Sequence, residues 1–554
     1  MKTDPDIELS VAARPDKESS SHSLEGMKAN LLLQGAGFAA LFIIAYAVEF
    51  LTSSLGDAYH RILPLTTIYR AILIATLLVW LVAWLGFAAC ERLPVRWKRV
   101  AWVVPFAFLP WLICRDLRSA FMRPKVVHVG ALALPWAVPV AVGLYLALFL
   151  RPKILDRCIL CARSAYVIAA FSLLIILPKV VPHAIRSGAQ EHSSFERAMG
   201  PSVSPLAPRI VWILLDELSY DQTFEHRQPD LALPNLDALS KTSVVFSAVQ
   251  PVGTMTQELL PALLLGKPIV KLRTPYTGLP SYQNRDDGPW QPFNQYDTIF
   301  GEARSRGWSS GLVGWYNPYC RLLQDVLSRC FWQYSETNRT ELSRFFLSTN
   351  TTAQNLAAIF PSPLVYRLFH LPLPDASPPR IRDYEDAMTQ SLDLLRDPRI
   401  RFAFLHLPVP HPPGMYDRVR QTMRQSGSYL DNLALADRSL GTLWNCIQST
   451  PGAKNTILIV SSDHSWRTFL WKPMGVWSPE DERASGGRFD PRPVLIVHLP
   501  GSTTAQTIAR PTSELFVHTM LEAMLRNQVH SDADIAALPP GTPVAGQGDM
   551  GEKK

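Results

Sequence analysis

Charged residues are scarce in this sequence. Of its 554 residues, 18% are Asp, Glu, Lys or Arg, whereas 47% are hydrophobic. This balance is apolar for a soluble protein, and a chain of this length is expected to form two or more domains. The net charge of +7 does not indicate nucleic-acid binding, because many Lys and Arg residues lie between long apolar runs. That placement is typical of membrane topology, so we expect no nucleic acid among the partners.

The first 28 residues lack the short apolar segment and the small-residue cleavage site of a signal peptide. They are polar and predict a mobile cytoplasmic tail, residues 1–28. The five apolar runs that follow predict a transmembrane domain of about five helices, residues 29–187, because crossing a bilayer takes about 20 apolar residues. The third run, VAWVVPFAFLPWLIC, is short and contains two prolines, so its span is the least secure.

Basic residues in short loops decide the orientation. If ERLPVRWKR and RPKILDRCILCARS are both cytoplasmic loops, five spans place the amino terminus inside and the large carboxy-terminal domain outside. The basic segment RDLRSAFMRPK would then lie outside, against the rule. If the third run does not span, the last domain is cytoplasmic instead. We favour the five-span alternative, which predicts a multi-pass protein of a bacterial-type inner (plasma) membrane with a periplasmic or extracellular domain.

The sequence has seven cysteines and lacks a second CxxC motif. Cys158 and Cys161 are therefore interpreted as an incidental pair in a loop between spans, and not as a metal or redox site. Cys320 and Cys330 bracket RLLQDVLSR, a separation that allows them to close a small loop in an oxidising compartment. An external domain thus predicts a disulfide, with two unrelated thiols as the alternative.

After a linker at residues 188–207, the chain alternates apolar strands with amphipathic helices. The expected strands include RIVWILL, SVVFSAV, SGLVGW, RFAFLHL, NTILIVSS and PVLIVHL. This pattern predicts an α/β domain with a buried, largely parallel central sheet over residues 208–530, followed by a flexible tail at 531–554. In such sheets, functional groups gather beyond the carboxyl ends of the strands.

Polar side chains follow three of these strands, and they are Asp216, Glu217, His411, Asp463 and His464. Each has a structural alternative, such as a turn for the acidic pair or a rigid proline-rich loop for His411. Thr256, before an apolar helical run, has the alternative of a helix N-cap. Together, a carboxylate pair, a hydroxyl at a helix start and an Asp-His pair are the parts that metal-assisted nucleophilic displacement requires.

These motifs and their order resemble the sulfatase and alkaline phosphatase superfamily. RIVWILLDELSYD is similar to that family's first strand and metal-binding acidic turn, and VSSDHS to its second metal motif. LPNLDALSKTSVVFSAV resembles the segment leading to the nucleophile, and TQELLPALLLG the nucleophile helix. The resemblance covers Pro208 to Arg526 and implies an alkaline phosphatase/sulfatase-like fold. It also implies that Thr256 is the nucleophile, with Thr254 as the alternative.

The sequence lacks the Cys or Ser, followed by Pro-x-Arg, that sulfatases convert to formylglycine. A threonine at this place resembles instead the membrane-bound phosphoethanolamine and phosphoglycerol transferases, which carry about five spans before an external domain. Two departures leave the substrate and the number of metal ligands open. Ser465 replaces the glycine after Asp-His, and WRTFLWKPMGVW lacks the histidine that many phosphoethanolamine transferases carry.

The resemblance implies one divalent cation held by Asp216, Asp463 and His464, with Glu217 as a possible further ligand. Zinc or manganese suits such mixed oxygen and nitrogen ligands, with magnesium or calcium as alternatives. His411 is expected to contact the phosphoryl group or protonate the leaving group, and His406 is the weaker alternative.

The expected activity is transfer of a phospho-group from a phospholipid donor to an envelope glycan or lipid. The alternatives are a phosphodiesterase or sulfuric ester hydrolase of the same fold, and a non-catalytic membrane receptor or scaffold.

The five-span topology predicts that Lys554 lies outside the cytoplasm. A reporter that is active only in the periplasm should work when fused to this terminus. A fusion that is active only with a cytoplasmic reporter would contradict both the topology and the external disulfide.

Overall fold

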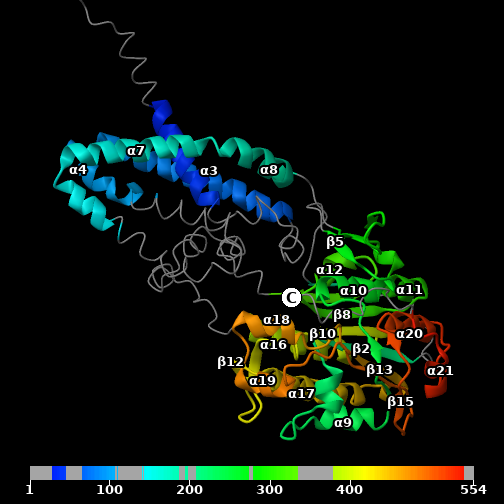
Figure 1. The fold of residues 1–554 in the computed structure, drawn as a ribbon. Helices are drawn as coiled ribbons and strands as arrows, with labels where there is room; N and C mark the ends of the chain where they lie inside the picture. The colour runs from blue at the N-terminus through cyan, green and yellow to red at the C-terminus, as the bar shows by residue number, and fades with distance from the viewer. Residues whose placement is uncertain are drawn as a thin grey trace, which may run out of the picture. The chain divides into compact units, whose positions relative to one another are not determined.

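The computed structural model describes residues 28–44, 65–106, 142–185, 194–197, 208–273, 279–334 and 379–541, and the single positions 109 and 140. The chain forms two compact units (Figure 1). The first consists of Met1–Thr52 and Leu65–Gly188, and the second of Ser53–Pro64 and Ala189–Lys554.

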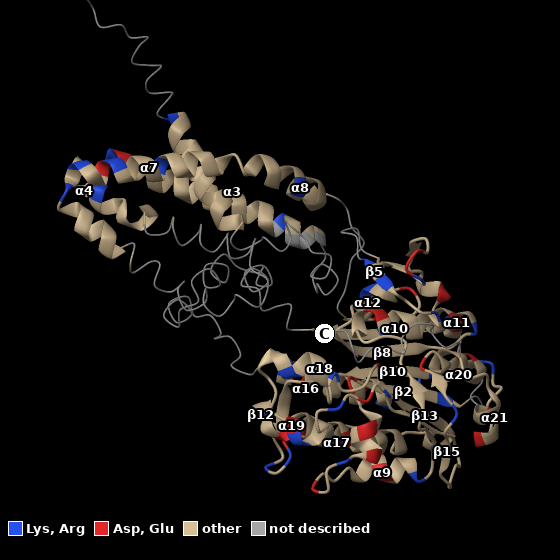
Figure 2. Cartoon of the chain, in the orientation of Figure 1, with Lys and Arg blue, Asp and Glu red and all other residues tan. Residues whose placement is uncertain are grey.

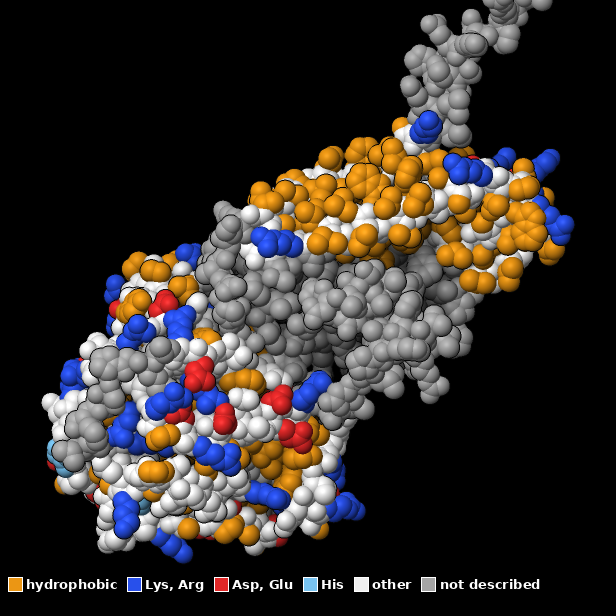
Figure 3. Space-filling model, turned by 180° about the vertical axis from the view of Figure 1, so that it is seen from behind, with side chains coloured by type: hydrophobic (Ala, Val, Ile, Leu, Met, Phe, Trp, Pro, Cys, Tyr) orange, Lys and Arg blue, Asp and Glu red, His pale blue; other side chains and the backbone are white. Residues whose placement is uncertain are grey.

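The described part of the first unit is helical. Its main helices are α3 (Leu65–Arg92), α4 (Val95–Ala101), α7 (Pro152–Ala170) and α8 (Leu173–Ile185). By length and composition, Ile72–Arg92 and Pro152–Ile185 could cross a membrane, and the apolar helix Lys28–Ile44 is shorter. Val82 on α3 is 68% exposed and Leu174 on α8 is 70% exposed, and Figure 3 shows hydrophobic side chains over much of this unit's described surface. The third and fourth apolar runs lie largely outside the described residues, so the five-span count stays a prediction.

The two basic segments of this unit were expected to be loops, and that expectation is wrong. α3 continues to Arg92 and α4 follows almost at once, while α7 includes both Cys158 and Cys161 as free thiols. Pro152 at the start of α7 favours helix there, since its fixed φ suits the first helical position. Ion pairs Arg99–Asp156, at 2.6 Å, and Arg163–Glu91 join the two segments. They therefore lie at one end of the unit (Figure 2).

The second unit contains a nine-stranded sheet with the order β1-β9-β8-β10-β2-β13-β14-β3-β15. Strands β9, β8, β10, β2 and β13 run parallel, as expected, whereas β14 is antiparallel to both of its neighbours and β1 is antiparallel to β9. The sheet is therefore mixed. The strand bounds are β1 Ser194–Glu196, β2 Arg209–Leu215, β3 Val244–Phe246, β8 Ser310–Trp315, β9 Arg329–Gln333, β10 Phe402–Leu407, β13 Thr456–Ser461, β14 Leu495–His498 and β15 Gln506–Ile508.

Helices cover both faces of this sheet (Figure 1). Side chains of β2 alternate between two cores: Trp212 packs with α10, α11 and α20, and Ile213 packs with α9, α16 and α17. A strand covered on both faces is apolar throughout, which explains why RIVWILL shows no polar alternation. The helices are α9 Pro234–Ser240, α10 Thr256–Leu265, α11 Ile299–Ser305, α12 Tyr319–Leu322, α16 Pro379–Arg396, α17 Tyr429–Gln448, α18 Thr468–Trp471, α19 Pro479–Ser485, α20 Phe516–Leu525 and α21 Asp532–Ala537.

Short elements complete the described part of the second unit. They are the π-helix η2 Asp221–Glu225, the 3-10 helices η3 Gln295–Asp297, η5 Ala453–Asn455 and η6 Lys472–Met474, and the strands β4 Val249–Gln250, β5 Lys271–Arg273, β6 Ser281–Gln283, β7 Gln291–Pro292, β11 Gly414–Asp417, β12 Thr422–Gly427 and β16 Thr512–Ser513.

Two expected boundaries of the α/β domain need correction. Residues 194–196, placed in the linker, form β1 and pair with β9 at the sheet edge. Residues 532–537, placed in the flexible tail, form α21, which is capped by Ser531 and buries Ile535 completely. A single buried isoleucine is too weak a pattern to predict this helix. Residues 542–554 lie outside the described residues.

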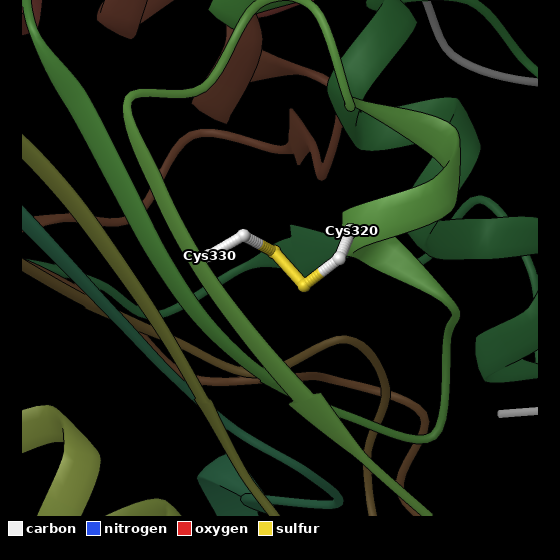
Figure 4. The surroundings of a disulfide bond; sticks show 2 residues. All are labelled: Cys320 and Cys330. Atoms are coloured by element: carbon white, nitrogen blue, oxygen red, sulfur yellow. A yellow bond between two sulfur atoms is a disulfide. The ribbon is translucent and has the colours of Figure 1, made fainter. Parts of the chain in front are cut away.

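A disulfide joins Cys320 of α12 to Cys330 of β9 (Figure 4), with a distance of 5.6 Å between the Cα atoms. The predicted pairing is thus confirmed.

A buried carboxyl group, Glu514, lies beside the pairing of β16 with β4. Its side chain is 1% exposed, and its Oε2 atom accepts a hydrogen bond of 3.2 Å from the backbone N–H of Val252. Its Oε1 atom has no hydrogen-bond partner within the described residues. Burial raises the pKa of Glu514 well above its usual value of 4.5. Since Val252 precedes α10 closely, Glu514 fixes the chain that leads to this helix.

The substitution Glu514→Gln should raise the melting temperature of the full chain in detergent, and more so at higher pH. A raised folded-state pKa means that the wild-type carboxyl group loses stability as the pH rises above its ordinary value of 4.5, whereas glutamine stays neutral. Melting temperatures of both proteins at about pH 5 and about pH 8 test this. Glu385→Gln, at an exposed position of α16, is the control. An equal effect of Glu514→Gln at both pH values would contradict the prediction.

Candidate active site

Three ligand-type side chains meet at the carboxyl ends of two adjacent strands. Asp216 follows β2, and Asp463 and His464 follow β13, which pairs in parallel with β2. Ligand atoms of these three residues all lie within 4.8 Å of one another. Within the cluster, His464 Nε2 is 3.1 Å from Asp463 Oδ2 and 4.0 Å from Asp216 Oδ1. The convergence that the sequence predicted for these residues is therefore present.

Thr256, the first residue of α10, directs its hydroxyl group into this cluster. The Oγ1 atom donates a hydrogen bond of 2.7 Å to Asp463 Oδ2 and lies 3.0 Å from His464 Nε2. Asn317 Nδ2 donates to the backbone carbonyl of Thr256 at 3.2 Å. Thr254, the alternative, contributes its backbone carbonyl as an acceptor for Arg467 at 2.9 Å. The structure thus brings the hydroxyl group of Thr256 to the cluster.

The donor set fits a divalent cation. Asp216 and Asp463 are both 0% exposed, and buried carboxylates side by side repel each other unless a cation or a proton lies between them. Burial and the charge of Asp463 raise the pKa of Asp216 well above its usual value. The Oδ1 atom of Asp216 has no hydrogen-bond partner in the described part of the chain. Two carboxylates and one imidazole suit zinc or manganese.

His406, on β10, lies behind Asp216. Its Nδ1 atom is 2.8 Å from the hydroxyl of Tyr319, and its Nε2 atom is 3.4 Å from Asp216 Oδ2. Burial lowers the pKa of His406 to about 4, so the ring is neutral. A neutral ring satisfies both contacts if Tyr319 donates to Nδ1 and the Nε2–H group donates to Asp216. His406 therefore orients a carboxylate of the cluster, in the way that outer groups fix metal ligands.

His411 lies on the loop after β10, between aromatic rings. Its ring centroid is 5.3 Å from that of Trp315 and 5.0 Å from that of Trp471. Arg380 holds the loop, since it donates to the backbone carbonyl of His411 and lies 2.7 Å from Nδ1. Burial and the charge of Arg380 lower the pKa of His411, which keeps the imidazole neutral.

Glu217 belongs to a second group of possible ligand atoms, with Asp216 and His411, that lie within 4.8 Å of one another. Its carboxylate is nevertheless engaged by Arg467 Nε, at 2.6 Å from Oε1, and by Trp471 Nε1, at 2.9 Å from Oε2. Burial raises the pKa of Glu217 to about 7, and the charge of Arg467 acts in the opposite direction. The structure thus brings Glu217 to the site with its oxygens already hydrogen-bonded.

Sequence reasoning missed several residues around the cluster, among them Tyr319, Arg380, Arg467 and Trp471. Arg467 could have been predicted from the sequence, because it follows the Asp-His pair by three residues in the same segment. The other three support the site from α12, α16 and α18, and no pattern in the sequence distinguishes them from ordinary aromatic or basic residues.

The sulfatase family pattern matches residues 208–525, which is more than half of the 554 residues. No curated protein matches the chain. Among solved structures, Ps i-CgsB in complex with k-i-k-neocarrahexaose shares 14% identity over 59% of this chain and 74% of its own, with a TM-score of 0.40. Phosphonate monoester hydrolase of Agrobacterium radiobacter shares 16% identity over 58% of this chain and 74% of its own, with a TM-score of 0.35.

A 2-O GAG sulfatase, BT1596, shares 12% identity over 59% of this chain and 72% of its own, with a TM-score of 0.35. Because these identities and TM-scores are low, the assignment rests on the family pattern over the α/β domain. The chain belongs to the sulfatase family of enzymes.

Proposed function

We propose that this chain is a membrane-anchored, metal-dependent transferase. It would move a phospho-group from a phospholipid donor, through Thr256, to a glycan or lipid of the cell envelope. The observation that carries the proposal is the hydrogen bond of 2.7 Å from the Thr256 hydroxyl to Asp463, inside the group of metal-ligand side chains. A hydroxyl at the start of a helix and beside such a group is the arrangement that nucleophilic displacement needs.

In the first step, Thr256 Oγ1 forms a bond to phosphorus as the bond from phosphorus to the lipid oxygen breaks. The hydroxyl proton passes to Asp463 Oδ2 and then to solvent, while the departing diacylglycerol oxygen takes up a proton from water. A divalent cation held by Asp216, Asp463 and His464 would supply positive charge that favours the ionised hydroxyl. In the second step, an acceptor hydroxyl displaces Thr256 from phosphorus, and Thr256 regains a proton.

His411 and the backbone of α10 would hold the phospho-group during both steps. The neutral ring of His411 can donate a hydrogen bond to a phosphoryl oxygen through the nitrogen that carries its proton. Among the described residues no side chain caps the start of α10, and the N-terminus of a helix favours an anion at the same place. Both features support the role expected for His411, as a group that contacts the phospho-group.

The membrane part of the proposal is supported by the first unit. Its two long apolar helical stretches, with outward-facing side chains such as Val82 and Leu174, have the composition of lipid-facing helices. Five spans and an external α/β domain would place the site in the compartment where the Cys320–Cys330 disulfide is stable. A phospholipid would then be available beside the site.

Hydrolysis is the second candidate function. Water in place of the acceptor would make the chain a phosphodiesterase or a sulfuric ester hydrolase, and membership of the sulfatase family favours this candidate. The position of the threonine favours transfer, because the chain lacks the Cys or Ser that sulfatases convert. A non-catalytic receptor or scaffold is disfavoured by the buried and complete group of Asp216, Asp463 and His464.

Thr256→Ala should lower the rate of transfer by on the order of 10⁴-fold or more, because it removes the nucleophile. The variant should keep the bound metal, because the three ligand side chains are unchanged. Mass spectrometry of the full-length protein after incubation with phospholipid vesicles would show the added group on Thr256 in the wild type alone. Thr254→Ala is the matched control and should keep the modification, whereas Asp463→Ala should lose both the metal and the activity. A wild-type chain that hydrolyses phosphodiesters without any modification of Thr256 would contradict the mechanism.

A further inference from the structure

Arg467 is a buried cation that joins three segments of the site. It is 4% exposed and lies on the segment that follows β13. Its Nε atom donates to Glu217 Oε1 at 2.6 Å, and its Nη2 atom donates to the same oxygen. Its Nη1 atom donates to the carbonyl of Thr254 at 2.9 Å. One guanidinium group therefore connects the tip of β2, the tip of β13 and the chain that enters α10.

The charge of Arg467 lies among the groups assigned to the reaction. Asp216, Glu217 and Asp463 all attract it and raise its pKa, against the effect of burial. After burial, Arg467 is the next cause that lowers the pKa of His464, and it contributes to the lowered pKa of His411. Its contacts place the guanidinium at Glu217, which adjoins Asp216 in the sequence, and over the ring of Trp471, whose centroid lies 5.0 Å from that of His411.

The hydrogen bonds of Arg467 leave a donor for a ligand. A guanidinium has five N–H groups. Two donate to Glu217, one to Thr254, and a fourth points to the sulfur of Met255 at 3.7 Å. Within the described residues, no acceptor is assigned to the remaining N–H of Nη2. A charged donor that is held by Glu217 and Thr254, and that keeps one N–H without an acceptor among the described residues, is suited to an anionic oxygen.

Glu217 has the contacts of an anchor for this arginine. Both of its oxygens accept hydrogen bonds, from Arg467 and from Trp471. Its backbone is fixed as well, because its N–H donates to Asp463 Oδ1 at 3.2 Å and its carbonyl accepts from Tyr429 at 2.8 Å. Its φ of 67° is uncommon for a residue other than glycine. In this conformation the side chain of Asp216 joins Asp463 and His464 in the cluster, while the side chain of the next residue, Glu217, contacts Arg467.

We propose that Arg467 binds a charged oxygen of the transferred phospho-group, and that Glu217 positions Arg467 and is not a metal ligand. The inference rests on the proposed function and adds a cation that the function did not require. A fixed guanidinium beside the reacting phosphorus stabilises the negative charge that develops on its oxygens during transfer, without reorganising in that step. Arg467 is then a catalytic residue, and Glu217 is a positioning residue.

Metal content and transfer rate separate these roles in the full-length protein in detergent. Glu217→Gln and Arg467→Lys should bind as much metal as the wild type, measured by elemental analysis, whereas Asp463→Asn should lose it. Arg467→Lys should lower kcat by on the order of 10²-fold, because lysine cannot contact Glu217 and the substrate together. Glu217→Gln should lower kcat by about tenfold, through a less well fixed arginine.

Two further variants distinguish a substrate contact from a structural one. Arg492→Lys is the matched control, because Arg492 pairs with Glu225 through bonds of 2.9 and 2.6 Å in a partly exposed place, and it should leave kcat unchanged. Arg467→Ala should regain part of its activity when ethylguanidinium is added, and Arg492→Ala should not respond.

Loss of metal from Glu217→Gln, to the level of Asp463→Asn, would overturn the positioning role. Loss of metal from Arg467→Lys, or an unchanged kcat in that variant, would overturn the catalytic role, as would an Arg467→Ala variant that ethylguanidinium does not rescue. If the wild type never carries a group on Thr256, the transferase proposal fails by itself. The same variants are then compared by hydrolysis of bis-p-nitrophenyl phosphate, which still tests Arg467.

Discussion

Two carboxylates, Asp216 and Asp463, are buried next to each other at the ends of adjacent parallel strands, and the rest of the site depends on this arrangement. In water the two charges would separate, but the pairing of β2 with β13 prevents it. The surrounding side chains contact both carboxylates. His464 and the Thr256 hydroxyl lie against Asp463, and His406 contacts Asp216 from behind. A divalent cation at this point would be attracted by both carboxylates. A water molecule, which carries no net charge, would compensate for their repulsion poorly.

The same constraint explains why the Thr256 hydroxyl enters the cluster from a helix and not from a strand. The tips of β2 and β13 already hold the acidic groups, so the remaining approach is from the end of the sheet, where α10 begins. Glu514 and Asn317 fix the backbone on this approach, before and at Thr256. The helix then packs its leucines into one core of the domain, which ties the position of a single hydroxyl group to a large apolar cluster.

The sequence allowed the parts with a local pattern to be predicted, and the structure shows why others were missed. Continuous apolar strands predicted the sheet, and the Asp-His pair at the end of one strand predicted the cluster. The antiparallel direction of β14 carries no local signal, because a strand buried on both faces has the same composition in either direction. The contacts of Arg467 with Glu217 and of His406 with Tyr319 join residues far apart in the sequence, so composition could not reveal them. The basic segments of the first unit were taken for loops because charge alone does not distinguish a loop from an exposed helix end.

Within the described residues, the nine-stranded sheet ends on both sides in strands of only three residues, β1 and β15. A long unpaired edge strand offers its free N–H and C=O groups to any other chain, which is a route to aggregation. β1 comes from the connection to the first unit and covers β9, which has five residues. Two short edges therefore disfavour the joining of sheets from neighbouring copies. The segment that leads into the domain thus also protects the domain from its own copies.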